Sequence, residues 1–185
     1  MKNLYILIFT LLISISISAQ TGGRYKTSET VEGEYLRALI VFAQFAGDER
    51  KNDVWQKNKL PNWAFEFIDA EVKKEYREIT LSDYWRQMSL GKFNLIGDVY
   101  PELVTISSEK SYLDKKANYE DANQDVLKEI DKYADFRKYD NWKYSKDEGK
   151  FVFDEQNGDG FVDLIIIIYR EPGKWFGGHY GAFTA

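Results

Sequence analysis

Two long apolar runs are the clearest feature of the chain after its first twenty residues. The run 36–45 (LRALIVFAQF) is nearly continuous and contains β-branched residues, which predicts a central strand buried on both faces. The run 161–169 (FVDLIIIIY) is more strongly apolar, and it predicts a buried strand in the middle of the sheet or next to it. Apolar residues alternate with small or polar ones over 93–99, which predicts a third strand ending at Pro101.

Apolar residues recur at helical spacing in three further segments. After the breaker Pro61, the pattern predicts a helix over 62–76. The second predicted helix begins at Thr80, a good N-cap residue, and ends at Gly91. Its apolar stripe follows the i, i+3, i+4, i+7 spacing and consists of Leu81, Tyr84, Trp85 and Met88. The third helix is predicted over 118–134, with a solvated charged side.

Alternating aromatic residues on both sides of a turn predict a small β-hairpin. Trp142 and Tyr144 precede the turn Asp147-Glu148-Gly149, and Phe151 and Phe153 follow it. The order of elements is strand, helix, helix, strand, helix, hairpin, strand. This order predicts an α/β or α+β domain in which one mixed, twisted sheet packs against helices.

The N-terminus has the layout of a secretory signal peptide. Residues 1–19 contain Lys2, an apolar run over 4–17 and the small residues Ser18-Ala19, so we expect cleavage before Gln20. The apolar run is shorter than the roughly 20 residues that a bilayer requires. We therefore expect a secreted or periplasmic protein without a membrane span once the signal is removed. The polar segment 20–34 is predicted to be a flexible leader, and 35–185 to be the domain.

Composition narrows the classes of partner. The formal net charge is −5, and the loss of Lys2 with the signal makes the mature chain more acidic. Nucleic acids and anionic membranes require clustered cations, so we exclude both as partners. The chain has no cysteine, so a secreted domain of this kind must rely on its core and, in many cases, on bound calcium. The aromatic content of 16% suits a packed core and a glycan-binding surface equally well.

The segment 155–163 (EQNGDGFVD) has the spacing of a calcium-binding loop. Oxygen-bearing side chains occupy every second position at Glu155, Asn157 and Asp159. A glycine then permits a sharp turn, Phe161 offers a backbone carbonyl, and Asp163 closes the loop. Hard oxygen ligands in this pattern favour calcium, so these five residues are the predicted metal site.

The same segment departs from an EF-hand and has a second interpretation. Its first position is a glutamate and its twelfth is Ile166, so the bidentate carboxylate is missing. Further ligands would have to come from elsewhere, with Asp154 and Asp140 the nearest candidates. The alternative is an Asn-Gly and Asp-Gly turn that leads into a strand without any metal.

The chain offers little for other catalytic chemistry. His179 is its only histidine and there is no cysteine, so an ordinary zinc site with three or four ligands cannot be assembled. A loop histidine with local hydrogen bonds is the simpler interpretation. A Ser-His-Asp triad would lack the Gly-x-Ser-x-Gly context of its nucleophile. We assign no catalytic residue.

Three segments, in order, resemble the immune inhibitor A-type metallopeptidases. The segment 39–45 (LIVFAQF) resembles their opening strand, and 82–93 (SDYWRQMSLGKF) resembles their passage from an aromatic-rich helix into a strand. The segments 135–140 (DFRKYD) and 157–163 (NGDGFVD) together resemble a signature that precedes a hydrophobic strand. In that family the two halves of the signature are usually joined, whereas residues 141–156 separate them here.

The resemblance implies a secreted zincin that cleaves a protein or peptide substrate. Its zinc would be held by a His-Glu-x-x-His helix and a third downstream ligand. This chain contains no such motif, so we interpret it as an incomplete N-terminal subdomain that stops before the zinc motif. Zinc is accordingly expected only in the full-length parent, and calcium in this part. The alternative is a non-catalytic secreted calcium-binding or glycan-binding module with exposed Trp and Tyr residues.

Overall fold

A computed structural model describes residues 34–73, 80–116 and 119–171 of the chain. The predicted signal peptide, nearly all of the predicted leader, and His179 lie outside the described residues. Within these ranges, no helix has both the length and the apolar character needed to span a bilayer.

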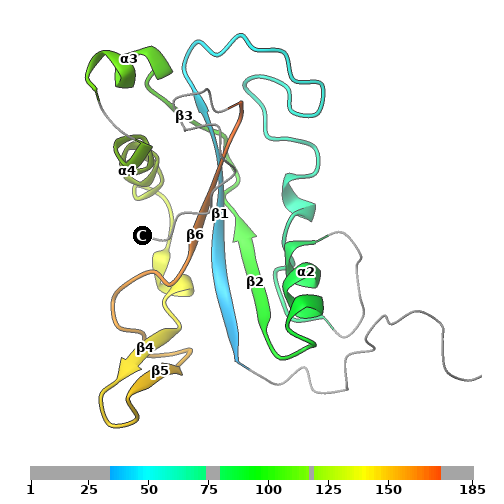
Figure 1. Cartoon of the computed structure of the whole chain (residues 1–185), viewed down its shortest axis with the longest axis vertical. Helices are drawn as coiled ribbons and strands as arrows, with labels where there is room; N and C mark the ends of the chain where they lie inside the picture. Colours follow the sequence, from blue (N-terminus) through cyan, green and yellow to red (C-terminus); the bar gives the residue numbers. More distant parts are fainter. Residues whose placement is uncertain (1–33, 74–79, 117–118, 172–185) are drawn as a thin grey trace, which may run out of the picture.

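The fold is built around one long central strand, β1 (Tyr35–Phe45). Three strands pair with it, all in parallel: β2 (Asn94–Val99), β3 (Val104–Ile106) and β6 (Ile165–Tyr169). Strands β2 and β3 pair one after the other along one edge of β1, and β6 pairs along the opposite edge (Figure 1). The prediction of a central strand buried on both faces is confirmed for β1.

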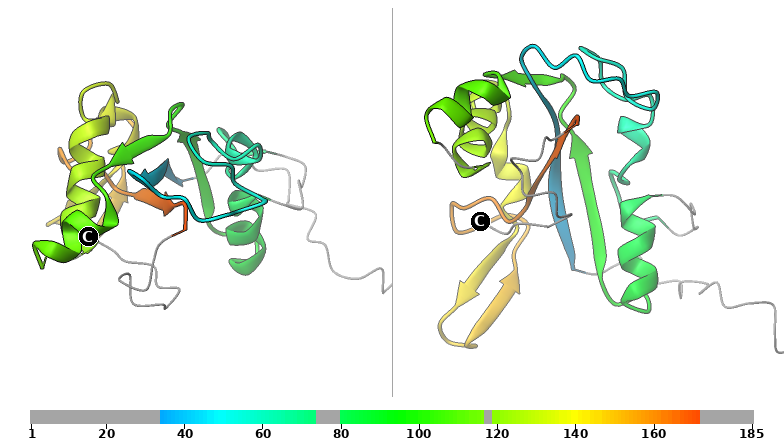
Figure 2. Two further views of the ribbon diagram at one scale, coloured as in Figure 1. Left: turned by 90° about the horizontal axis from the view of Figure 1, so that it is seen from above. Right: turned by 45° about the horizontal axis from the view of Figure 1, so that its top comes forward.

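Alternate residues of β1 supply two separate cores on the two faces of the sheet. One face packs against α4 (Tyr119–Ile130), whose Ala122, Val126 and Ile130 are buried. The other face packs against the segment that contains Trp55 and Ala64. Figure 2 shows α4 on one side of the sheet, and the 3₁₀ helix η1 (Ala64–Glu66) and the helix α2 (Leu81–Met88) on the other.

The α+β class is confirmed, and the predicted hairpin is present. Its arms, β4 (Trp142–Ser145) and β5 (Lys150–Phe153), pair antiparallel as a separate two-stranded sheet. The structure therefore has two sheets where one mixed sheet was predicted. The four strands of the sheet that contains β1 are all parallel, and the antiparallel pair forms the separate hairpin. Three short elements were not predicted, and they are β3, α3 (Glu109–Asp114) and the 3₁₀ helix η2 (Phe136–Tyr139).

The predicted helix over 62–76 is wrong in its described part. Residues 62–73 contain only η1, because their backbone groups bond to other segments. The Phe67 carbonyl accepts a hydrogen bond from Leu81 N at 2.7 Å, and the Asp69 carbonyl accepts one from Gly97 N at 2.9 Å. These carbonyls therefore anchor the segment to α2 and β2 and are not used in a helical ladder.

The start of α2 lies where the sequence predicts it, and its last helical residue, Met88, lies just before the predicted end at Gly91. The Thr80 hydroxyl accepts a hydrogen bond from Asp83 N at 3.1 Å, which is the expected N-cap. Gly91 adopts a φ of 78°, and its amide donates to the Arg86 carbonyl at 2.8 Å, which ends the helix.

The orientation of α2, in contrast, is the reverse of the prediction. Its buried residues are Ser82, Asp83 and Arg86, whereas Tyr84 is 54% exposed and Met88 64% exposed. Polar contacts explain this orientation: Ser82 Oγ accepts from Asp69 N at 3.0 Å, and an Arg86 guanidinium nitrogen donates to the Lys73 carbonyl at 2.7 Å. The aromatic stripe of α2 therefore faces outward.

The last strand and the last helix are both shorter than the sequence predicts. Strand β6 covers only the last five residues of the predicted 161–169 strand and is half-buried. Residues 161–164 form a loop instead, since Asp163 N donates to the Tyr139 carbonyl at 2.7 Å. Helix α4 ends at Ile130, whose carbonyl accepts from both Tyr133 N and Ala134 N.

Candidate functional site

The candidate site is the acidic loop, residues 154–163, which links the hairpin to β6. The hairpin formed by the insertion 141–156 closes on itself at its base. Trp142 pairs with Phe153, and the Asn141 carbonyl accepts from Asp154 N at 2.7 Å. The insertion therefore projects from the body (Figure 1) and returns the chain to where it left.

Asp140 lies directly against the acidic loop. Its Oδ1 accepts a hydrogen bond from Asp159 N at 2.9 Å, and its Oδ2 accepts one from Gly160 N at 2.8 Å. Gly158 is equally close, because a Cβ added there would lie 1.8 Å from Asp140 Oδ1 and 2.4 Å from its carbonyl oxygen. The segments 135–140 and 157–163 are thus in contact despite the insertion between them.

Asp163 joins the same group from the end of the loop. Its Oδ2 accepts hydrogen bonds from Asn141 N at 2.6 Å and Trp142 N at 3.2 Å. Burial raises the pKa of the Asp163 carboxyl above its ordinary value, while these two amides lower it. The negative charges of Asp140 and Asp159 raise this pKa further, so these carboxylates repel the charged form of Asp163.

Two of the predicted ligands are directed elsewhere. Glu155 Oε1 accepts from the Tyr35 hydroxyl at 2.6 Å, and burial together with this carboxylate raises the pKa of Tyr35 to about 12. The Asn157 side-chain amide donates to Asp154 at 3.3 Å. A hydrogen bond from Lys143 to Asp154, together with two loop amides, holds the pKa of Asp154 below its ordinary value.

The other predicted ligands lie at the turn itself. Asp159 Oδ1 accepts from Phe161 N at 3.1 Å, and the Phe161 side chain is 76% exposed. The structure therefore brings Asp159 and Asp163 together with Asp140, but not Glu155 or Asn157. Across the ranges that the structure describes, no three acidic or histidine side chains converge as a formed metal shell.

Asn141 is a functional candidate that the sequence pattern did not reveal. It is 3% exposed, and its side-chain oxygen has no hydrogen-bond partner among the described residues. An unpaired amide oxygen in a buried position is costly, and it is a hard donor of the kind that calcium prefers. Its only sequence signal is its position next to Asp140. The side-chain oxygens of Asp140, Asn141, Asp159 and Asp163 are all of the kind that calcium prefers.

Zinc does not fit this part of the chain. His179 lies outside the described residues, and the sequence has neither a second histidine nor a cysteine. Carboxylates alone are not an ordinary zinc ligand set.

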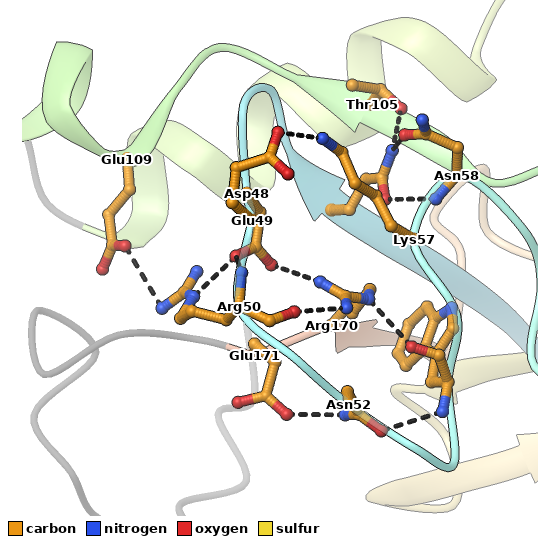
Figure 3. A network of polar contacts seen from close by, with 12 residues as sticks. Asp48, Glu49, Arg50, Asn52, Lys57, Asn58, Thr105, Glu109, Arg170 and Glu171 are labelled. Carbon is orange, nitrogen blue, oxygen red and sulfur yellow. Dashed lines mark hydrogen bonds and ion pairs between the residues drawn. The ribbon is translucent and has the colours of Figure 1, made fainter.

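A second polar cluster lies at the carboxyl ends of β1 and β6, where Figure 3 shows Arg170 enclosed by the segment that follows β1. Arg170 is 2% exposed and donates to Asp48 Oδ2 at 2.7 Å. Its other nitrogens donate to the carbonyls of Trp55 at 2.9 Å and Arg50 at 2.7 Å. All three donating nitrogens of the guanidinium are thus used to fix one loop.

Asp48 is the counter-charge of this cluster. Burial alone would raise the pKa of Asp48, but hydrogen bonds from Arg50 and the charge of Arg170 bring it below its ordinary value. Nearby, Gln44 Nε2 donates to Asn58 at 2.7 Å and to Thr105 at 3.0 Å. The cluster therefore stabilises the end of the sheet.

No family model matches the chain, and no curated protein matches it.

Proposed function

We propose that the chain is the N-terminal part of the catalytic domain of a secreted metallopeptidase, in which the acidic loop is a calcium-dependent structural element. One observation carries this proposal. The two halves of the signature, 135–140 and 157–163, are separated in sequence but bonded in space through Asp140. The insertion that separates them forms a hairpin and does not displace them.

The other two resembling segments support the same proposal by their positions. The segment 39–45 lies in the central strand β1, and 82–93 runs from α2 to the start of β2. The third segment contacts the same sheet, because the Tyr139 hydroxyl donates to Asp98 of β2 at 3.2 Å. In this proposal the sheet is the framework of a peptidase domain, and the zinc ligands belong to residues of the full-length parent downstream.

Calcium would be held by the carboxylates of Asp140, Asp159 and Asp163 and by the side-chain oxygen of Asn141. Each carboxylate oxygen that accepts one amide hydrogen keeps a further lone pair for a cation. Burial, and after it the negative charges of Asp140 and Asp159, raise the pKa of Asp163, and a bound cation would offset the repulsion between these carboxylates. It would also join the start of the hairpin to the loop before β6.

We expect calcium to raise the melting temperature of the protein. Binding to the folded state alone stabilises by about 2.7 kcal/mol when calcium is at a hundred times its Kd. Thermal unfolding should be compared in EDTA, millimolar calcium and millimolar magnesium, because magnesium requires a tighter octahedral shell. Asp159→Asn should abolish the calcium response. Asp135→Asn, which changes an exposed carboxylate paired with Arg137, should retain it.

Equal melting temperatures in EDTA and calcium would contradict the calcium site. A response that survives Asp159→Asn would place calcium elsewhere in the chain.

We expect proteolysis only when the chain is extended through its downstream reading frame. Both forms should be assayed on casein with zinc and calcium, with and without a zinc chelator. The matched control is the extended form with its motif glutamate changed to glutamine, which should be inactive. Chelator-sensitive proteolysis by residues 20–185 alone would contradict the proposal. An inactive extended form without a His-Glu-x-x-His motif would favour the calcium-binding or glycan-binding module instead.

A further inference from the structure

The acidic loop contains two residue pairs that can form a succinimide, a ring that joins a side chain to the backbone amide of the next residue. These pairs are Asn157-Gly158 and Asp159-Gly160. Asparagine is one of the thermally labile residues, and glycine, which has no side chain, leaves its own amide open to such a ring. The two pairs differ in how the structure holds the amide that would attack.

The amide of Gly160 is occupied, whereas that of Gly158 is not. Gly160 N donates to Asp140 Oδ2 at 2.8 Å, so an attack on Asp159 would first break a hydrogen bond to a charged group. Gly158 N has no hydrogen bond to any of the described residues. Asn157 is itself exposed, and Figure 1 shows the loop between β5 and β6 at the edge of the molecule. The structure therefore favours ring closure at Asn157 over ring closure at Asp159.

We propose that Asn157 is a site of spontaneous deamidation. Water or hydroxide takes the proton of Gly158 N, this nitrogen forms a bond to Asn157 Cγ, and the bond between Cγ and Nδ2 breaks. Nδ2 takes up a proton from water and leaves as ammonia. A second water then adds to either carbonyl of the succinimide and opens the ring. The product is aspartate, or isoaspartate, in which the main chain runs through the former side chain, and no oxidant or reductant is needed.

Packing explains why the loop contains this labile pair. A Cβ at position 158 would lie 1.8 Å from Asp140 Oδ1, so the contact with Asp140 requires the residue that makes Asn157 labile. Asn157 also holds the loop, because its backbone N and its Nδ2 donate to Asp154 Oδ1 at 3.1 and 3.3 Å. The inference depends on these contacts, and it does not depend on calcium or on the proposed peptidase function.

Deamidation is expected to loosen the acidic loop. It replaces the side-chain donor of Asn157 by a carboxylate, which then faces the Asp154 carboxylate to which Asn157 was bonded. In isoaspartate the main chain also gains a methylene just before Gly158, which shifts the amides that follow away from Asp140. The modified protein should therefore unfold at a lower urea concentration than the fresh protein, and isoaspartate should be the more damaging product.

Peptide mapping by mass spectrometry tests the site in the intact protein. The folded protein should be incubated at physiological temperature and sampled over several weeks. The fraction of aspartate and isoaspartate at position 157 should rise with time. Asn62, which is also exposed but is followed by Trp63, should stay unmodified, and so should Asp159. Asn157→Gln is the matched control: it keeps a side-chain amide but would need a larger ring, so no modification should accumulate at position 157.

Asp140→Ala tests why the second pair is spared. Without its acceptor Gly160 N is free, so isoaspartate formation at Asp159 should become roughly 10- to 150-fold faster, which is the effect of losing a hydrogen bond to a charged group. Asp135→Asn should leave both rates unchanged. The parent protein alone decides the proposal. Modification at Asn157 that is no faster than at Asn62, or that occurs only in urea, would overturn it.

Discussion

Asp48→Asn is expected to lower the free energy of unfolding by about 3–5 kcal/mol, which is the usual cost of breaking a buried ion pair from one side. Asp48 and Arg170 are almost fully buried, and their charged atoms lie 2.7 Å apart. The substitution leaves the Arg170 guanidinium charged and desolvated, with only carbonyl partners. Urea unfolding followed by circular dichroism measures the effect.

A charge-free replacement provides the control. Asp48→Leu combined with Arg170→Met removes both charges, and it should cost less than Asp48→Asn because no ion remains buried alone. Glu129→Gln removes one partner of an exposed pair with Lys132 and should change stability little. If Asp48→Asn is as mild as Glu129→Gln, then Arg170 is not held by this ion pair.

The sequence predicted the parts of this fold that depend on local pattern. A nearly continuous apolar run with β-branched residues favours a strand covered on both faces, and β1 is that strand. The cap of α2 follows from two residues, Thr80 and Asp83, whose spacing is enough to form the bond. The hairpin follows from aromatic residues that alternate around one turn. None of these features requires knowledge of distant contacts.

The wrong predictions depend on contacts between segments far apart in the chain. The apolar stripe of α2 predicts an inward face, but the bond between Ser82 and Asp69 turns the polar side toward the sheet. Periodicity over 62–76 predicts a helix, but the carbonyls of Phe67 and Asp69 bond to α2 and β2. Hydrophobic pattern cannot show where a buried polar group finds its partner.

The candidate site also combines residues that local spacing predicts with residues that depend on contacts between distant segments. Spacing alone identified Asp159 and Asp163, because alternation along the loop is a local property. Asp140 was only the nearest candidate, since its distance from the loop depends on how residues 141–156 fold. Asn141 could not be found by pattern, because its buried and unpaired oxygen exists only once the hairpin has closed.

Gly158→Ala is expected to separate the two halves of the site and to cost roughly 3 kcal/mol, the upper end of the usual range for overpacking. The added Cβ would lie 1.8 Å from Asp140 Oδ1 and 2.4 Å from the Asp140 carbonyl oxygen. A carboxylate can rotate away, but a backbone carbonyl cannot do so without moving the chain. The hydrogen bonds from Asp159 N and Gly160 N to Asp140 should therefore be lost.

A double-mutant cycle gives this prediction a sharp test. Combining Gly158→Ala with Asp140→Ala removes the side-chain part of the clash, so the combined loss should be smaller than the sum of the two single losses. Gly149→Ala is a reference for strain without a clash: this glycine has a φ of 66°, unlike Gly158, and no neighbouring atom lies within 4 Å, so its cost comes from the backbone alone. Urea unfolding of the four variants and the parent protein supplies all the values. Two results would contradict the prediction: additive losses for the substitutions at 140 and 158, or a Gly158→Ala cost no larger than that of Gly149→Ala. Either result would mean that Asp140 and the acidic loop are not joined in solution. The main support for the proposed function would then be lost.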